Sequence, residues 1–169
     1  MANVWIGLGS NLENPAKQVT DAFVELANLP KTQLLSTSSL WKSKPFGPQD
    51  QPDFINAVAE LATELEPLVL LTHLQAIETL HQRKRVRHWG PRTLDLDMLL
   101  YDKLVLTGEK LTLPHPGIVE RAFVLCPLAE LNENLSIPNL GSVKQLIQQL
   151  GKQACSEVLP LEAKAVTSF

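Results

Sequence analysis

Hydrophobic residues follow two different periods along the first half of the chain. Residues 4–9 are a short apolar run that predicts a buried strand, and residues 53–63 alternate with a period of two, which predicts another strand. Between them, apolar residues recur at helical spacing after Pro15, which suits the first helical position, with Asn14 as a candidate N-cap. Residues 32–41, rich in Thr, Ser and Leu, predict a further strand. This half therefore predicts the order strand, helix, strand, strand.

The second half begins with another helix and another strand. Pro67 opens a helix whose apolar residues gather on one side, and residues 93–101 form a predicted strand after a basic loop at 82–92. The remaining predicted elements are an extended segment at 110–116, a helix at 118–131 with a break near Pro127, and a short helix at 142–150.

This order of elements predicts the fold class. Strand, helix, strand, strand, helix, strand, followed by helical additions, favours an α+β fold with a ferredoxin-like antiparallel sheet on which helices pack. A length of 169 residues with 44% hydrophobic residues suits one domain with a substantial core. No hinge-like linker divides the chain, so residues 1–169 are expected to form a single-domain sandwich, with 151–169 as a peripheral C-terminal tail.

Composition narrows the possible functions. A formal net charge of -3 gives no global attraction to nucleic acid or to an anionic membrane. The N-terminus carries no positively charged leader, and no apolar stretch approaches the ~20 residues that span a bilayer. Cys126 and Cys155 form no CxxC pair, so two reduced, partly buried thiols are expected. We therefore expect a cytoplasmic protein that binds neither membrane nor nucleic acid. A monomer is also expected, although composition does not determine the oligomeric state.

The strand predicted after the basic loop carries two carboxylates on one face. Side chains two residues apart on a strand point the same way, so Asp95 and Asp97 lie side by side. Adjacent carboxylates repel each other unless a cation lies between them, and Mg²⁺ prefers oxygen ligands that it shares with phosphates. The alternative is a solvated strand face with two unpaired acids. Because Leu99 continues the same face, simple solvation is the poorer explanation.

A basic run stands directly before these acids. Its members are Arg83, Lys84, Arg85, Arg87, His88 and Arg92. Arginines beside a carboxylate metal site suit polyphosphate transfer, because the metal bridges phosphate oxygens while guanidinium groups hold the others and neutralise developing charge. The alternative is a solvated surface or a weak nucleic-acid patch, against which the net negative charge counts. The sequence contains no P-loop motif, so if the protein binds ATP, it does not use a P-loop.

Several segments together resemble one enzyme family. Residues 88–99, HWGPRTLDLDML, resemble the signature of the 6-hydroxymethyl-7,8-dihydropterin pyrophosphokinases. Residues 6–11, IGLGSN, resemble the family's N-terminal strand and turn, and residues 47–57, GPQDQPDFINA, resemble its pterin loop. Three shorter segments follow in the right order at 75–78, 113–116 and 121–123. The resemblance covers residues 3–130 and is specific, since a chance acid pair would not bring the other segments with it.

The resemblance implies an activity and a role for each matching residue. The enzyme would transfer pyrophosphate from ATP to the hydroxymethyl group of the pterin, giving AMP and the pterin diphosphate, in tetrahydrofolate biosynthesis. Two Mg²⁺ ions would bind Asp95 and Asp97. The residues implied to contact pterin are Ser43, Lys44, Phe46, Phe54, Asn56, Trp89, Asp95 and Phe123. Those implied to bind ATP are Gln75, Glu78, Arg85, Arg92, Met98, Lys110, Leu111, Thr112, His115 and Arg121. The implied catalytic residues are Arg83, Arg85, Arg92 and Asp97.

Two positions depart from the family pattern, and two other functions stay open. Gln82 stands where a glycine is common, and Lys44 stands where a proline is frequent; both lie in loops and bear on loop motion more than on chemistry. One alternative is another magnesium-dependent phosphoryl or nucleotidyl transferase that does not use pterin. The other is a non-catalytic module that binds RNA through residues 83–92.

Overall fold

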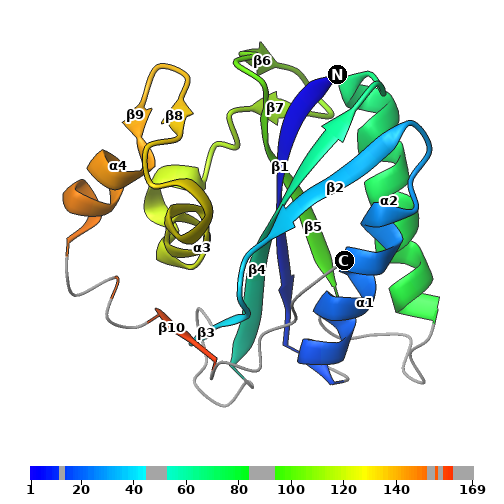
Figure 1. The fold of residues 1–169 in the computed structure, drawn as a ribbon, viewed down its shortest axis with the longest axis horizontal. Helices are drawn as coiled ribbons and strands as arrows, with labels where there is room; N and C mark the ends of the chain where they lie inside the picture. The colour runs from blue at the N-terminus through cyan, green and yellow to red at the C-terminus, as the bar shows by residue number, and fades with distance from the viewer. Residues whose placement is uncertain (12–13, 45–52, 84–93, 152–154, 156–157, 162–169) are drawn as a thin grey trace.

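The computed structural model describes residues 1–11, 14–44, 53–83, 94–151, 155 and 158–161, with Arg83 described by its backbone alone. Within these residues, helices lie on both sides of one main sheet, with α1 and α2 on one side and α3 and α4 on the other (Figure 1). In chain order the elements are β1 (Ala2–Ser10), α1 (Pro15–Ala27), β2 (Thr32–Thr37), β3 (Trp41–Ser43), β4 (Phe54–Thr63), α2 (Pro67–Arg83), β5 (Asp95–Tyr101), β6 (Leu106–Thr107), β7 (Thr112–Leu113), the 3-10 turn η1 (Ile118–Glu120), α3 (Ala122–Asn132), β8 (Ser136–Ile137), β9 (Gly141–Ser142), α4 (Val143–Leu150) and β10 (Val158–Pro160).

The main sheet has the order β10-β3-β4-β1-β5, with β2 also paired to β4, and all of these pairings are antiparallel. When β2 and β3 are taken as two parts of one strand, this is the ferredoxin-like order, with α1 and α2 as its crossover helices. The predicted α+β fold is therefore confirmed.

One strand predicted at 32–41 is divided into two by Ser38. The backbone N–H of Ser38 donates to the Val58 carbonyl at 2.8 Å, and its hydroxyl accepts the Val58 N–H at 2.9 Å. A side-chain oxygen thus replaces a backbone carbonyl at this point of the ladder. As a result β2 pairs with the second half of β4, and β3 pairs with its first three residues.

Of two local predictions about helices, one is confirmed in position only and the other is wrong. Asn14 occupies the N-cap position of α1 but adopts a left-handed backbone, with φ 63°, and forms no side-chain cap, since capping residues usually need an extended backbone. Pro127 lies inside α3 without ending it, whereas the predicted helix at 118–131 is interrupted at Arg121, whose backbone is extended. The prediction that α1 begins at Pro15 is confirmed.

The two faces of the sheet bury separate apolar clusters. Strands β1, β4 and β5 direct every second side chain toward α1 and α2, and the intervening side chains face α3 and α4. The first cluster extends along the sheet and includes Ile6, Leu61 and Met98. The second is built around Trp5 and Val58 and does not include the polar residues at the other end of this face. No helix of the described residues is long and apolar enough to cross a membrane.

The C-terminal region contributes a strand that the sequence patterns did not predict. Strand β10 pairs with β3, the Leu161 N–H donates to the Leu40 carbonyl at 2.8 Å, and Val158 is buried. The expectation of a wholly peripheral tail is therefore wrong for residues 158–161. Cys126 and Cys155 are half-buried free thiols, as expected. Burial, followed by the neighbouring Cys155, raises the pKa of Cys126 to about 12.

Candidate active site

A pocket opens on the face of the sheet that carries α3, where β1, β3, β4 and β5 approach the beginning of that helix. It is lined by Gly7, Leu8, Gly9, Ser43, Lys44, Phe54, Asn56, Ala57, Asp95, Asp97, Arg121, Phe123 and Val124. Six of these are residues that the sequence implied for pterin binding: Ser43, Lys44, Phe54, Asn56, Asp95 and Phe123. The structure therefore brings together side chains from β3, β4, β5 and α3, which are distant in the sequence.

The floor of the pocket is made by glycines on β1. Gly9 is paired with Asn56 on β4 and with Asp95 on β5, so these three residues share the pocket face. Because Gly9 has no side chain, a hollow is left between the other two. A Cβ added at Gly9 would lie 3.3 Å from Oδ1 of Asn56, which is a tight contact. The signal in the sequence is a glycine in a strand interior, which often marks the close approach of a ligand.

Asn56 is oriented by a hydrogen bond inside the protein. Its Nδ2 donates to the hydroxyl of Ser43 at 2.7 Å, and the two residues are 4% and 6% exposed. A buried amide held in this way offers a remaining N–H and a carbonyl oxygen in fixed directions. The resemblance named Ser43 only as a pterin contact, so its hydrogen bond to Asn56 was not predicted.

Two aromatic side chains stand on different walls of the pocket. Phe54 begins β4, and Phe123 belongs to the first turn of α3. Both are only half-buried, so the pocket presents apolar rings from two sides beside a few polar groups, as ligand sites commonly do. The guanidinium carbon of Arg121 lies 5.8 Å from the centre of the Phe123 ring, within the range of a cation–π contact.

Charged groups gather at the edge of the pocket. Nη1 of Arg121 lies 3.8 Å from Oδ2 of Asp97. Burial lowers the pKa of His115 and nearby Arg121 lowers it further, while Asp97 opposes both effects. Nδ1 of His115 accepts the Gly117 N–H at 3.0 Å, so a neutral imidazole carries its proton on Nε2 and can donate from there. A Cβ at Gly117 would lie 2.8 Å from Nε of Arg121, so this glycine, not identified from the sequence, makes room for the arginine.

Comparisons with known proteins agree on one family. Residues 5–133 match the model of the 7,8-dihydro-6-hydroxymethylpterin-pyrophosphokinase (HPPK) family. The chain belongs to this family. It is 46% identical over 160 residues to the 2-amino-4-hydroxy-6-hydroxymethyldihydropteridine pyrophosphokinase of Haemophilus influenzae, covering 95% of this chain and 100% of that one. It is also 46% identical over 144 residues to the enzyme of the same name from Pseudomonas aeruginosa, covering 85% of this chain and 89% of the relative.

Solved structures of the family share the fold. A crystal structure of wild-type HPPK-DHPS from Plasmodium falciparum with pteroate has a TM-score of 0.70 at 14% identity, covering 88% of this chain. The alignment spans 42% of that longer chain, so this chain corresponds to less than half of it. At this identity the likeness concerns the fold alone.

The residues expected to bind ATP are less concentrated than those expected to bind pterin. Arg121 lines the pocket, and His115 lies within electrostatic range of Arg121 and Asp97. Glu78 lies on α2, where its Oε2 accepts the Leu96 N–H of β5 at 2.8 Å. The others differ in exposure: Met98 and Leu111 belong to the core, Thr112 is half-buried, and Gln75 and Lys110 are exposed.

Part of the expected site lies outside the described residues. This holds for Phe46, Arg85, Trp89, Arg92 and the side chain of Arg83. Within the described residues, no group of three or more His, Cys, Asp or Glu side chains could hold a metal ion. Asp95 and Asp97 do provide two carboxylates on one face of β5, and both line the pocket.

Proposed function

We propose that this chain transfers the pyrophosphoryl group of ATP to the hydroxymethyl oxygen of 6-hydroxymethyl-7,8-dihydropterin, as a diphosphokinase of folate biosynthesis. The products are AMP and the pterin diphosphate. The observation that supports this proposal most is one pocket lined by all six described pterin-binding candidates, Asp95 among them, and by Asp97. Membership of the HPPK family supports the same activity.

The pocket suits a flat, polar ring. Phe54 and Phe123 bracket the ring, and their apolar faces replace water on its two sides. Asn56, held by Ser43, presents a donor and an acceptor to the amide edge of the pterin. Because these groups are buried and fixed, a ring without that edge would leave them unpaired, which disfavours such a ligand.

The acid pair suits magnesium. Asp95 and Asp97 carry oxygen ligands at alternate positions on one strand face, and oxygen ligands are the kind that Mg²⁺ prefers. We propose that the two aspartates hold two Mg²⁺ ions. When bound, the ions would supply positive charge that offsets the negative charge of the phosphate groups.

The remaining residues position the triphosphate. Arg121 and the Nε2–H of His115 donate to phosphate oxygens, and Arg83, Arg85 and Arg92 are proposed to do the same. The hydroxymethyl oxygen forms a bond to the β-phosphorus as the bond from that phosphorus to the α-phosphate oxygen breaks, and AMP leaves with the bonding electrons. Asp97 is the candidate acceptor of the hydroxyl proton. Catalysis then depends mainly on alignment and charge neutralisation.

The nucleoside of ATP would lie beyond the phosphates. Gln75, Glu78, Met98, Lys110, Leu111 and Thr112 are proposed to surround the adenosine. Because the buried side chains of Met98 and Leu111 are part of the core, backbone groups would make their contacts. We also propose that the protein is a cytoplasmic monomer.

A product assay tests this function directly. The protein is incubated with ATP, Mg²⁺ and 6-hydroxymethyl-7,8-dihydropterin, and the nucleotides are then separated. AMP should form only when pterin is present, and it should be lost in Asp95→Ala and Asp97→Ala. ADP would show simple phosphoryl transfer instead. Folded protein that binds ATP but forms no pterin-dependent product would overturn the proposal.

A further inference from the structure

A carboxylate outside the pocket connects two of its walls. Glu130, near the end of α3, accepts hydrogen bonds from the segment that joins β2 to β3. Its Oε1 and Oε2 accept the backbone N–H of Ser39 at 3.1 and 3.0 Å, and Oε2 also accepts the Ser39 hydroxyl at 2.7 Å. Oε1 accepts the indole N–H of Trp41 at 2.8 Å. These three residues are called the Glu130 clamp below.

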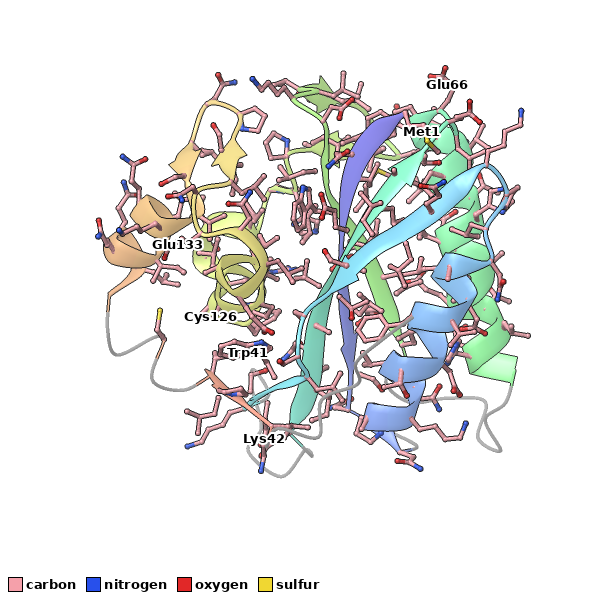
Figure 2. The ribbon with its side chains drawn as sticks, viewed as in Figure 1. Met1, Trp41, Lys42, Glu66, Cys126 and Glu133 are labelled. Carbon is pink, nitrogen blue, oxygen red and sulfur yellow. The ribbon has the colours of Figure 1, made fainter. Side chains whose placement is uncertain are left out.

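The clamp joins elements that present different side chains to the pterin pocket. On α3, Glu130 follows Phe123 by seven residues, which is two helical turns, so both side chains lie on the same side of the helix. Trp41 begins β3, whose last residue, Ser43, lines the pocket. Figure 2 shows Trp41 between α3 and the end of the sheet that carries β3.

Trp41 also lies directly beside the residue that is proposed to recognise pterin. It is paired with Asn56 across β3 and β4, so the two residues share the face that α3 covers. A displacement of Trp41 would therefore move the neighbourhood of Asn56, whereas a displacement of Glu130 would move the helix that carries Phe123. The clamp acts on both sides of the expected ring position.

Among the other described interactions of α3, one long ion pair joins its N-cap residue Arg121 to Asp97 of β5 at 3.8 Å, and the packing of the helix on the sheet is apolar. The helix packs on the sheet through Val124, Leu125 and Leu128, and such apolar contacts have little directional preference. Its N-terminus has no side-chain cap. Hydrogen bonds to a carboxylate are directional and stronger than neutral ones, so the clamp can define the orientation of the helix where apolar packing does not.

We propose that Glu130 is a positioning residue for the pterin substrate, which sets the distance between Phe123 on α3 and the strands that carry Ser43 and Asn56. The inference rests on the proposed function. Glu130 is absent from the residues that line the pocket, so it acts through α3 and β3 and does not touch the substrate. A flat ring held between two aromatic side chains tolerates little change in the gap, because a misplacement of about 1 Å can cost two orders of magnitude in rate.

The test compares the two substrates in steady-state kinetics. Glu130→Ala should raise KM for pterin about tenfold, the ratio expected when charge-assisted hydrogen bonds are lost, while KM for ATP stays within about twofold. Glu130→Gln keeps one acceptor oxygen and should give a smaller increase. Trp41→Phe keeps an aromatic ring but loses the donor, and its effect should not add fully to that of Glu130→Ala.

The matched control is Glu133→Ala. Glu133 is an exposed acid at the C-terminal end of the same helix. Its substitution by Ala should leave the KM values for pterin and for ATP unchanged. Folded Glu130→Ala with an unchanged KM for pterin, or with both KM values raised equally, would overturn the positioning role. If Glu130→Ala does not fold, Trp41→Phe decides alone by the same criterion. Wild-type protein without pterin-dependent AMP would refute the proposed function, which is a separate outcome.

Discussion

The two faces of the central sheet are built by the same strands but serve different purposes. Toward α1 and α2, most residues of β1, β4 and β5 are apolar and form one cluster that extends along the sheet. Toward α3, the same strands bury Trp5 and Val58 at one end but present Asn56, Asp95 and glycines at the other. The period of two thus lets one strand contribute to the core and to the site at successive residues.

This difference shows how a pocket can form on a packed sheet. A hollow between β4 and β5 requires that the strand between them carry no side chains there, and Gly7 and Gly9 on β1 fulfil this requirement. The cost is lost apolar packing on that side, which the apolar cluster on the other face offsets. We therefore expect substitutions on the face toward α1 and α2 to change mainly stability, and substitutions on the face toward α3 to change mainly substrate recognition.

The largest expected effect is on catalysis from the pocket face. Asp97→Asn keeps the size of the side chain but removes its charge, so pterin-dependent AMP formation should fall about a thousandfold or more. The free energy of unfolding should change by less than about 0.5 kcal/mol, because the side chain is partly exposed. Product assay and urea denaturation on the same preparation measure both. A large loss of stability would contradict the separation of the two faces.

The converse substitution lies on the face of the sheet that packs against α1 and α2. Leu61 is fully buried against α1 and α2, so Leu61→Ala should reduce the free energy of unfolding by about 3 kcal/mol through lost burial and the cavity that remains. Turnover per folded molecule should stay within about twofold of wild type. Denaturation curves and kcat, corrected for the folded fraction, test this. A selective loss of kcat in stable protein would show that the face toward α1 and α2 contributes to catalysis.

Asn56 offers a sharper test of pterin recognition. Asn56→Ala removes the recognition amide and leaves the Ser43 hydroxyl without this partner, so KM for pterin should rise about thirtyfold while KM for ATP stays unchanged. Ser43→Ala should have a smaller effect, and Ser43→Thr, which keeps a hydroxyl, should largely restore binding. The three variants are compared by titrating each substrate separately. Equal increases in both KM values would argue against a specific pterin contact.

The smallest expected effect comes from the pocket floor. Gly9→Ala places a methyl group 3.3 Å from Oδ1 of Asn56, so KM for pterin should rise a few-fold as the amide shifts, about 1 kcal/mol in binding. Gly7→Ala is the comparison variant: its added carbon would meet the Leu99 side chain at 3.4 Å and not Asn56, so the increase in KM for pterin should be smaller. Kinetics of both variants at saturating ATP give the comparison. A larger effect of Gly7→Ala would mean that the floor acts through Leu99 packing.

Long periodic elements of the fold could be predicted from the sequence. β1, α1, β4, α2 and β5 each repeat their pattern over many residues, and their order is sufficient to specify the ferredoxin-like plan. Short strands such as β6 and β8 have two residues each and show no period. The division at Ser38 also escaped prediction, because it depends on one side-chain hydrogen bond to a strand that follows later in the chain.

The candidate site, like the fold, could be predicted from the sequence only in part. Side chains with distinctive chemistry, such as Asp95, Asn56 and Phe123, could be named because they stand in segments that resemble a family. Gly117 and Glu130 could not be assigned in this way, since their roles arise from contacts across the fold that no local pattern encodes. The sequence thus indicates the groups that meet the substrate more readily than the residues that arrange them.

The pairing of β10 with β3 bears on the order in which parts of the protein can fold during synthesis. β3 lies between β4 and β10, and β10 follows every other described strand and helix in the chain. A nascent chain can therefore assemble β4, β1 and β5 on α1 and α2 while one edge of β3 still lacks its partner. The wall that carries Ser43 is completed only when residues 158–160 leave the ribosome. The protein should accordingly acquire its core before it acquires its affinity for substrate.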